Sequence, residues 1–225
     1  MTGIFASALG DGIAALHPRM AQRLALSTAG GVGMIGHGVM ERIWRGPAFT
    51  APFLRLGATR HILFPEQGRD VPFTIENYPY LDAHGRETVS FVRTFELPGR
   101  RRRFDAQMVY NPARGRIVDY LGTHQHLAVD LDITVRPDGG FRIRSGEFRL
   151  AEGPLRAVVP RALTGVAEVN EWFDEASGRF RVEVAVVNHR FGPLFGYRGA
   201  FEARFVETGT GVSGAVKPLR EKVLD

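Results

Sequence analysis

The sequence contains no cysteine, which excludes disulfide bonds, thiolate metal sites and a cysteine nucleophile. Lysine is almost absent too, with Lys217 and Lys222 alone, so arginine carries most of the positive charge behind the net charge of +5. No run of eighteen apolar residues occurs, and a membrane-spanning helix is not predicted. The start of the chain lacks a basic n-region and has Asp11 within its apolar part, which favours a folded segment over a cleaved signal and predicts a cytoplasmic location.

Sequence motifs for cofactors and catalysis are missing or stand in the wrong context. Gly31, Gly33 and Gly36 have the spacing G-x-G-x-x-G, but a helical pattern precedes them and a strand-like pattern follows, the reverse of what a dinucleotide site needs. No acidic residue follows about twenty positions later to bind a ribose. We therefore predict that this stretch is a flexible connection from a helix to the first strand, and we predict no bound cofactor. A G-x-S-x-G elbow is also absent, so a serine hydrolase is not expected.

Apolar residues recur at three- and four-residue spacings from Ile4 to Leu16, which predicts an amphipathic helix. Pro18 either ends this helix or begins a second short one, because proline suits a first helical turn. After the glycines the apolar period changes to two, as in strands. The predicted strands cover residues 39–45, 71–78, 87–97, 102–111, 116–122, 126–136, 141–150, 166–174, 179–190 and 195–206, with further helices near 51–56 and 154–163.

Short turns between these strands indicate antiparallel neighbours, and closure into a barrel would remove the exposed edges. We predict a mainly β (α+β) fold, a strongly curved antiparallel sheet or calycin/lipocalin-like β-barrel of about ten strands with an N-terminal helix. Residues 1–207 are expected to form this single domain. Residues 208–225 are rich in glycine and are expected to be a loosely ordered tail.

Three stretches carry a resemblance to a known family. They are Leu16-His17-Pro18, then Arg93-Thr94-Phe95 followed by Phe104, and above all GRFRVEVAVVNHRFGPLFGYRGAF at residues 178–201. From about residue 5 to residue 205 the chain resembles an uncharacterised bacterial family, the domain of unknown function numbered four-one-six-six. Members often look like partners of, or C-terminal attachments to, short-chain or saccharopine-reductase-like NAD(P) enzymes. The resemblance thus implies a separately encoded NAD(P) oxidoreductase as a partner, and it brings no catalytic residues.

Polar residues interrupt the apolar face of several predicted strands, and in a small barrel such positions point inward. The expected interior residues are Arg93, Asp119, Glu168, Asn170, Asn188 and Tyr197 among the apolar Phe91, Phe95, Trp172 and Phe195. Buried charges cost several kcal/mol unless they are paired, so Arg93 is expected to meet Asp119 or Glu168.

Two interpretations of these residues remain open. In the first, Arg93 and the carboxylates form a structural network that fixes strand register. In the second, they surround a ligand cavity, where Glu168 or Asp119 acts as acid or base and Arg93 or Tyr197 stabilises negative charge. The ligand contacts would then come from Phe91, Phe95, Trp172, Asn188 and Phe195.

Two other features have less weight. His124 and His126 form an H-x-H pair, but His126 shares its predicted face with Asp130 and Asp132, which indicates the solvent side, and no metal site is predicted. The arginines at 100–103 follow Pro98-Gly99, which is typical of a solvated hairpin tip. Nucleic acid is not expected there, and contact with an anionic membrane is a weak alternative.

The functional hypothesis is a cytoplasmic domain that binds a small hydrophobic metabolite of a polyketide-, terpenoid- or lipid-like kind. It would act as a cofactor-independent isomerase, cyclase or lyase by acid/base polarisation, as in secondary metabolism. The alternative is a non-catalytic carrier, or an accessory domain for a separate NAD(P)-dependent reductase. The oligomeric state is not predicted.

Overall fold

The amino-terminal segment is helical, but it is not one helix. In the computed structural model, which describes residues 3–160, 162, 164–208 and 211–224, α1 (Ile4–Leu9) leads into a 3-10 helix, η1 (Gly10–Ala15), and then into α2 (Pro18–Leu24). Gly10 has a φ of 52°, which an α-helix does not contain, so the single helix predicted here is broken. Pro18 begins α2, because its missing N–H is not needed in the first turn.

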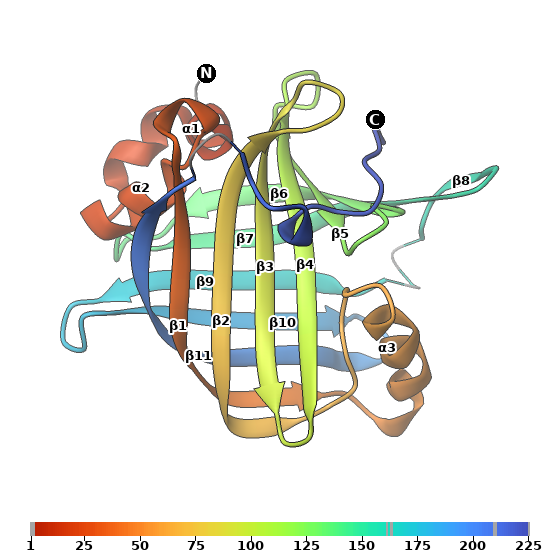
Figure 1. Cartoon of the computed structure of the whole chain (residues 1–225). Helices are drawn as coiled ribbons and strands as arrows, with labels where there is room; N and C mark the ends of the chain where they lie inside the picture. Colours follow the sequence, from red (N-terminus) through yellow and green to blue (C-terminus); the bar gives the residue numbers. More distant parts are fainter. Residues whose placement is uncertain (1–2, 161, 163, 209–210, 225) are drawn as a thin grey trace.

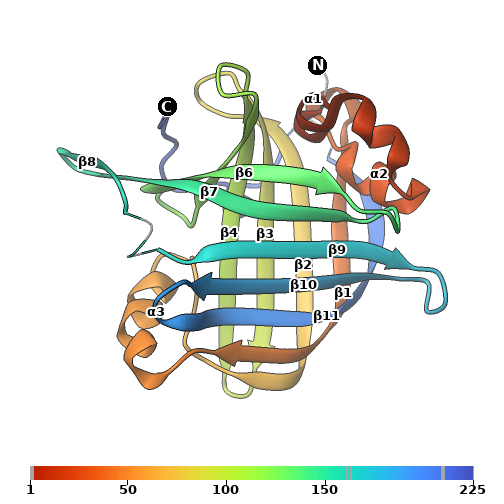
Figure 2. The same cartoon turned by 180° about the vertical axis from the view of Figure 1, so that it is seen from behind.

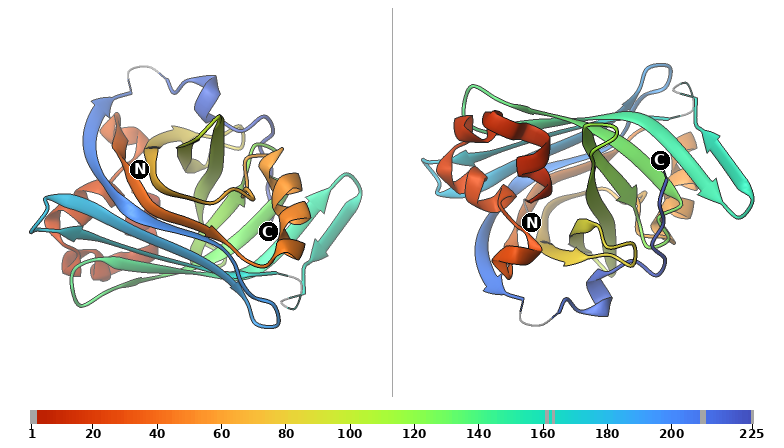
Figure 3. Two further views of the ribbon diagram at one scale, coloured as in Figure 1. Left: turned by 90° about the horizontal axis from the view of Figure 1, so that it is seen from below. Right: turned by 90° about the horizontal axis from the view of Figure 1, so that it is seen from above.

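Antiparallel strands follow, and ten of them close into a barrel (Figure 1; Figure 3). They are β1 (Val32–Arg45), β2 (Gly68–Leu81), β3 (Glu87–Leu97), β4 (Arg100–Asn111), β5 (Arg116–Leu121), β6 (Leu127–Val135), β7 (Phe141–Glu152), β9 (Val166–Asp174), β10 (Arg179–Asn188) and β11 (Gly192–Glu207). The order is β6-β5-β4-β3-β2-β1-β11-β10-β9-β7, and pairing of β6 with β7 closes the ring. An extra strand, β8 (Leu155–Val158), pairs with the end of β7. The prediction of a mainly β barrel with a helical start is confirmed.

The opening glycines belong to a strand. β1 begins at Val32 instead of residue 39, so Gly33 and Gly36 lie inside it and the predicted flexible connection is wrong. A Cβ atom added at Gly36 would lie 2.7 Å from side-chain atoms of both Ile75 and Phe201. The absence of side chains on this part of β1 therefore lets large neighbours pack against its backbone.

Helices outside the amino terminus agree with the prediction at one place and not at another. The helix expected near residues 51–56 is α3 (Ala51–Ala58), preceded by a 3-10 turn, η3 (Ala48–Thr50). The helix expected near 154–163 is instead the strand β8 and the chain after it, with residues 161 and 163 outside the described part. Within that described part, no helix has the length and apolar character needed to cross a bilayer.

Aromatic side chains from β2, β3, β10, β11 and the segment before β2 fill the barrel interior. The cluster consists of Phe64, Phe73, Phe95, Phe180, Phe195, Tyr197 and Phe201, none of them more than 3% exposed. Neighbouring ring centroids lie between 5.0 and 6.4 Å apart in edge-on, tilted or stacked arrangements. Burial of each such ring contributes about 1.5–3 kcal/mol, so this cluster is a major source of stability.

The C-terminal segment, residues 211–224, packs across the outer face of the barrel over β3, β4 and β5 (Figure 1). Ser90 donates a hydrogen bond to the Val216 carbonyl, and the Leu224 N–H donates to the Tyr120 hydroxyl at 3.2 Å. Leu224 joins a small apolar cluster with Tyr120 and Val118 on this outer face. The loosely ordered tail predicted for residues 208–225 is therefore not what the structure has, because an apolar outer face requires a cover. Residues 209, 210 and 225 lie outside the described part.

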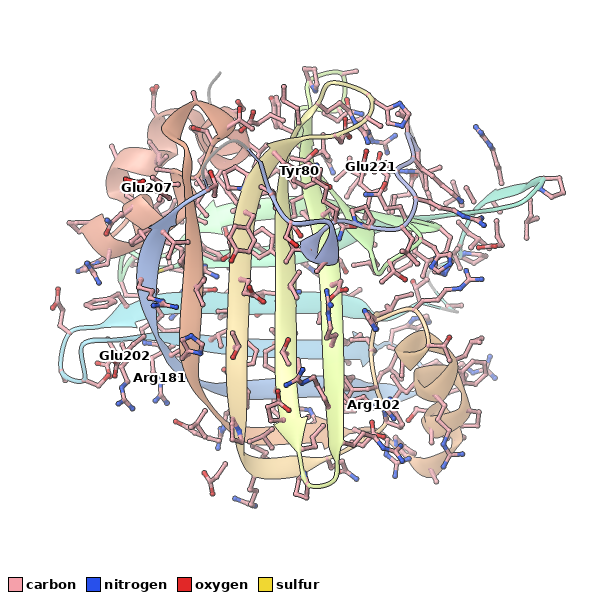
Figure 4. All side chains as sticks on the ribbon, in the orientation of Figure 1. Tyr80, Arg102, Arg181, Glu202, Glu207 and Glu221 are labelled. Carbon is pink, nitrogen blue, oxygen red and sulfur yellow. The ribbon has the colours of Figure 1, made fainter. Side chains whose placement is uncertain are left out.

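Charged side chains project from much of the remaining outer surface (Figure 4). Figure 4 shows Arg181 and Glu202 projecting from the outer surface, away from the barrel interior. It also shows Glu221 of the C-terminal segment beside Tyr80 of β2. Burial, together with the negative charge of Glu221, raises the pKa of Tyr80.

Candidate functional site

The barrel has one covered end and one end with a less complete cover. Figure 2 shows α1 and α2 over one end, and α3 and β8 beside the opposite end. At the opposite end the loop after α3 is held to the barrel by the Thr123 N–H, which donates to the Arg60 carbonyl at 3.0 Å, and by an Arg60–Glu152 ion pair of 2.7 Å.

Inward-facing apolar side chains toward this second end are half-buried. They are Phe104 of β4, Leu121 of β5, Phe148 of β7, Val169 of β9 and Val186 of β10. On the facing side of the interior, Phe95 and Phe195 are fully buried. These side chains pack against the core but remain partly accessible to solvent, in contrast to the fully buried rings that face them.

A buried ion pair links α2 to the barrel wall. Arg23 of α2 and Glu171 of β9 are each 3% exposed, and Nη1 of the arginine contacts Oε1 of the glutamate. The Arg23 guanidinium also lies 5.4 Å from the centroid of the Phe201 ring and 3.5 Å from Asn77 Oδ1. Burial raises the pKa of Glu171, and the positive charges of Arg23 and Arg93 oppose this rise. A carboxylate thus lies inside the barrel, paired with Arg23 and influenced by the charge of Arg93.

Arg93 stands on β3 between two aromatic rings. Its guanidinium carbon lies 4.6 Å from the centroid of Phe104 and 5.5 Å from that of Phe91, distances at which cation–π attraction is favourable. Its Nη1 atom is buried and has no hydrogen-bond partner. Among the ion pairs of the described residues, none includes Arg93. The expected direct pair of Arg93 with Asp119 or Glu168 is therefore wrong.

Asp119 lies on β5 and is 8% exposed. Its Oδ1 atom is buried without a hydrogen-bond partner. Burial raises the pKa of Asp119 to about 7, although the charge of Arg93 lowers it. A carboxyl group with this pKa exists in both protonation states near neutral pH, which is the condition for acid or base work.

Tyr197 of β11 completes the group. Its ring is 1% exposed and lies 5.2 Å from Phe95 and 6.2 Å from Phe195, centroid to centroid. Burial raises the pKa of Tyr197, so its hydroxyl keeps its proton and can donate a hydrogen bond. We call Arg23, Arg93, Asp119, Glu171 and Tyr197 the central polar cluster. It offers donors and acceptors inside an otherwise apolar barrel.

Four of the predicted interior residues lie elsewhere. Glu168 is on the outer face, with a side chain that is 43% exposed and lies 3.6 Å from Arg142. Asn170 donates to Glu168 on that same outer face. Trp172 also faces outward, with Arg136 at 5.2 Å from its ring.

Asn188 is buried, but its side chain binds the backbone of neighbouring turns and does not point into the barrel interior. Its side chain donates to two carbonyl groups, those of Ala162 and Thr164, and accepts from the N–H groups of Arg190 and Phe191. Its hydrogen-bonding capacity is taken up by backbone, so it holds the end of β10 to the segment before β9.

The sequence reasoning missed Glu171 and Arg23. The strand 166–174 has apolar residues on both faces. The sequence pattern alone predicts an inward position for the face of Trp172 as readily as for that of Val169 and Phe173. The strand pairing resolves this ambiguity, because Glu171 lies opposite Val182 of β10, whose neighbours Phe180 and Val184 point inward. For Arg23, the signal was its place next to Leu24 and three residues after Met20, both of which are buried.

Features outside the barrel interior offer weaker candidates for a functional site. His126 lies on the outer face as expected, but it is 9% exposed beneath the C-terminal segment, and burial lowers its pKa. Among residues that the structure describes, no group of three histidine, aspartate or glutamate side chains is placed to hold a metal ion. Two surface hollows of about 300 and 380 Å³ lie beside the C-terminal segment and beside the Arg114–Asp130 ion pair, and their linings include no member of the central polar cluster.

The arginine run at the β3–β4 hairpin is neutralised by acidic neighbours. Arg100 and Arg102 pair with Glu66 at 3.0 and 2.5 Å. Arg101 pairs with Glu96 at 2.7 Å, and Arg103 pairs with Asp105 at 2.9 Å. The hairpin therefore presents much less positive charge than its sequence indicates.

The comparisons with known proteins concern the same part of the chain. The family model described as Domain of unknown function (DUF4166) matches residues 16–201, a range that contains every member of the central polar cluster. The chain is also similar to the Uncharacterized protein YndH of Bacillus subtilis (strain 168), with 36% identity over 187 residues that cover 83% of this chain and 90% of YndH. As the sequence resemblance indicated, the protein belongs to the DUF4166 family.

Proposed function

We propose that the barrel interior binds a small, largely apolar molecule, polyketide-, terpenoid- or lipid-like, whose oxygen-bearing end meets Arg93 and Asp119. One observation carries this proposal. Nη1 of Arg93 and Oδ1 of Asp119 are buried without hydrogen-bond partners in the barrel interior, among apolar side chains that are only partly buried. An unpaired buried polar group costs about 1–3 kcal/mol, and native proteins usually satisfy such groups with water, an ion or a ligand.

The two unpaired atoms have different chemistry, which narrows the kind of ligand. Arg93 offers a charged donor suited to a carbonyl or carboxylate oxygen. Asp119 can accept from a hydroxyl when ionised and donate to a carbonyl when protonated. A molecule with an oxygen-bearing end and an apolar body, such as a hydroxylated or oxidised hydrocarbon, matches both atoms and the walls formed by Phe104 and Leu121.

The same arrangement supports acid/base chemistry on the bound molecule. Asp119, with its pKa of about 7, would transfer a proton to or from a carbon or hydroxyl of the ligand. Arg93 and the Tyr197 hydroxyl would stabilise the negative charge that develops on oxygen. The Arg23–Glu171 pair would position these groups. Isomerisation, cyclisation or dehydration can proceed with one proton-transferring group and donors that stabilise negative charge on oxygen.

A non-catalytic carrier is the second candidate, and one observation favours it. No hydrogen bond joins Asp119 to another member of the central polar cluster within the described structure, so a relay for the proton is not assembled. In this case the domain would hold the molecule for another protein, such as a separately encoded NAD(P) oxidoreductase.

The first test is native mass spectrometry of the purified protein, followed by denaturing extraction and identification of any released molecule. A stoichiometric apolar molecule with an oxygen function would support binding. For a defined probe we would titrate cis-parinaric acid and its methyl ester and follow their fluorescence. The acid should bind more tightly than the ester, because only the acid offers a carboxylate to Arg93.

Matched variants locate the probe. Arg93→Met should weaken binding of the acid by about tenfold or more and reduce its preference over the ester, since hydrogen bonds to charged groups contribute about 1.5–3 kcal/mol. Arg142→Gln, on the outer face, is the control and should leave binding unchanged. If both variants bind like the parent, or if neither probe binds and no molecule is extracted, the proposed site is wrong. Catalysis is then separated from carriage by Asp119→Asn, which should stop conversion of the extracted molecule but keep its binding.

A further inference from the structure

Apolar side chains stand exposed on α3 and on the neighbouring β10–β11 turn. Phe53 is 75% exposed, Leu56 70%, Phe49 50% and Phe191 44%. Phe49, Phe53 and Leu56 are spaced by four and three residues, so they share one face of the continuous η3–α3 helical segment, while Leu54 on the other face is buried. The Phe49 and Phe191 rings lie 5.5 Å apart, which joins the turn to the helix. We call these four residues the α3 patch.

Cations surround the α3 patch without acidic partners. Arg55 and Arg190 are exposed, and within the described residues neither takes part in an ion pair, in contrast to the neutralised arginines of the β3–β4 hairpin. The Arg190 guanidinium lies 5.7 Å from the Phe191 ring, at the edge of the α3 patch. The surface thus combines exposed aromatic and aliphatic groups with free positive charge.

A second projection lies at the same end of the barrel. β8 and α3 stand on either side of the ends of β9 and β10 (Figure 2). On β8, Leu155 is 55% exposed and Val158 58% exposed, with the exposed Arg156 between them. The same composition, apolar side chains beside an arginine, therefore recurs on two separate projections.

We infer that this end of the molecule docks on an anionic lipid bilayer, with the α3 patch inserted among the lipids and Arg55 and Arg190 against their phosphate groups. Large apolar side chains next to unpaired cations are complementary to the boundary between acyl chains and anionic head groups. A protein partner would favour a broad surface of matched shape, whereas separate projections suit a deformable lipid surface. The inference depends on the surface alone and does not require a ligand in the barrel.

The experiment is co-sedimentation of the protein with vesicles of phosphatidylcholine alone and of phosphatidylcholine with phosphatidylglycerol. The protein should bind the vesicles that contain phosphatidylglycerol, and binding should fall as salt is added. Phe53→Glu should reduce the bound fraction at least about tenfold, because a phenylalanine that inserts among the lipids is replaced by a charge that anionic lipids repel. Arg55→Gln with Arg190→Gln should also reduce it severalfold.

Leu219→Gln is the matched control, since Leu219 is 76% exposed but belongs to the C-terminal segment and not to the α3 patch. It should bind vesicles like the parent protein. Circular dichroism of each variant would verify that it is folded, and Phe53→Gln provides a milder change at the same place. The inference is overturned if the parent protein binds neither vesicle or if Phe53→Glu and Leu219→Gln reduce binding equally. It is also overturned if Phe53→Glu converts a dimer to a monomer in analytical ultracentrifugation while vesicle binding stays the same, because a second copy would then cover the α3 patch.

Discussion

Replacing Asp119 by asparagine should stabilise the protein at alkaline pH. Burial raises the pKa of Asp119 from its ordinary 3.8 to about 7, so the folded chain keeps a proton that the unfolded chain releases above pH 3.8. The stability that depends on this proton is present at low pH and is lost as the pH rises to about 7. The difference between the two pKa values corresponds to about 4 kcal/mol, since each pKa unit is about 1.36 kcal/mol. Asparagine has the shape of the protonated group and cannot ionise, so it removes this loss.

Urea unfolding of both proteins at several values between pH 4.5 and pH 8.5 would measure the effect. The variant should be more stable by about 1 kcal/mol at the acidic end and by about 4 kcal/mol at the alkaline end. Glu171, whose pKa is also raised, is present in both proteins, so its contribution cancels in the difference. Asp132→Asn is the control, because it makes the same substitution at a side chain that is 57% exposed.

One result of these unfolding experiments would refute the reasoning about Asp119. If the parent and the Asp119→Asn variant differ by the same amount at both ends of the pH range, then Asp119 does not titrate between 3.8 and 7. The carboxylate would then have partners that satisfy it when ionised. Its proposed role in proton transfer near neutral pH would lose its basis.

Three further predictions concern the barrel and its cover. Arg23→Met should lower the free energy of unfolding by about 3–5 kcal/mol, because it leaves the Glu171 charge buried and unpaired. Adding Glu171→Leu should recover most of the lost stability. An unchanged urea midpoint for Arg23→Met would contradict this prediction. Gly36→Ala should cost about 1–3 kcal/mol through overpacking, whereas Gly214→Ala, with no atom within 4 Å of the added Cβ, should be neutral in the same assay. A chain without residues 211–224 should lose about 3–6 kcal/mol, because two buried apolar side chains of that segment leave the outer face, and a truncated chain as stable as the parent would mean that the segment is not docked.

The architecture could be predicted because it depends on local patterns. Alternating apolar residues and short turns indicated antiparallel strands, and their number indicated a closed barrel. The start of β1 could not be found in this way, because its glycines resemble a loop until Ile75 and Phe201 are known to pack against them. The cover provided by the C-terminal segment was missed for the same reason. Its contacts with β3, β5 and β7 span more than seventy residues of sequence.

The candidate site was predictable wherever a polar residue stood between two residues that are plainly buried. Arg93 between Phe91 and Phe95 is such a case, and it lies in the interior as predicted. The same argument wrongly placed Glu168 in the interior. Trp172, four residues later on the same face of the strand, is apolar but packs on the outside against Arg136. That contact joins distant segments, and one strand read alone does not reveal it. The neighbouring strand does, since residues opposite each other in a sheet share a face.

The two sides of the barrel interior differ in what they contribute. The close-packed rings around Phe95 and Phe195 contribute stability, and Tyr197 adds a hydroxyl to them. The other side holds Arg93 and Asp119 with unsatisfied atoms, which reduces stability unless something pairs with them. A protein selected for stability alone would fill this side with apolar residues, because well-packed hydrophobic replacements of buried charges are often neutral or stabilising. Under the proposed function, a bound molecule would compensate both charges. Such a molecule should stabilise the folded chain by about 2.7 kcal/mol when its concentration is a hundred times its Kd.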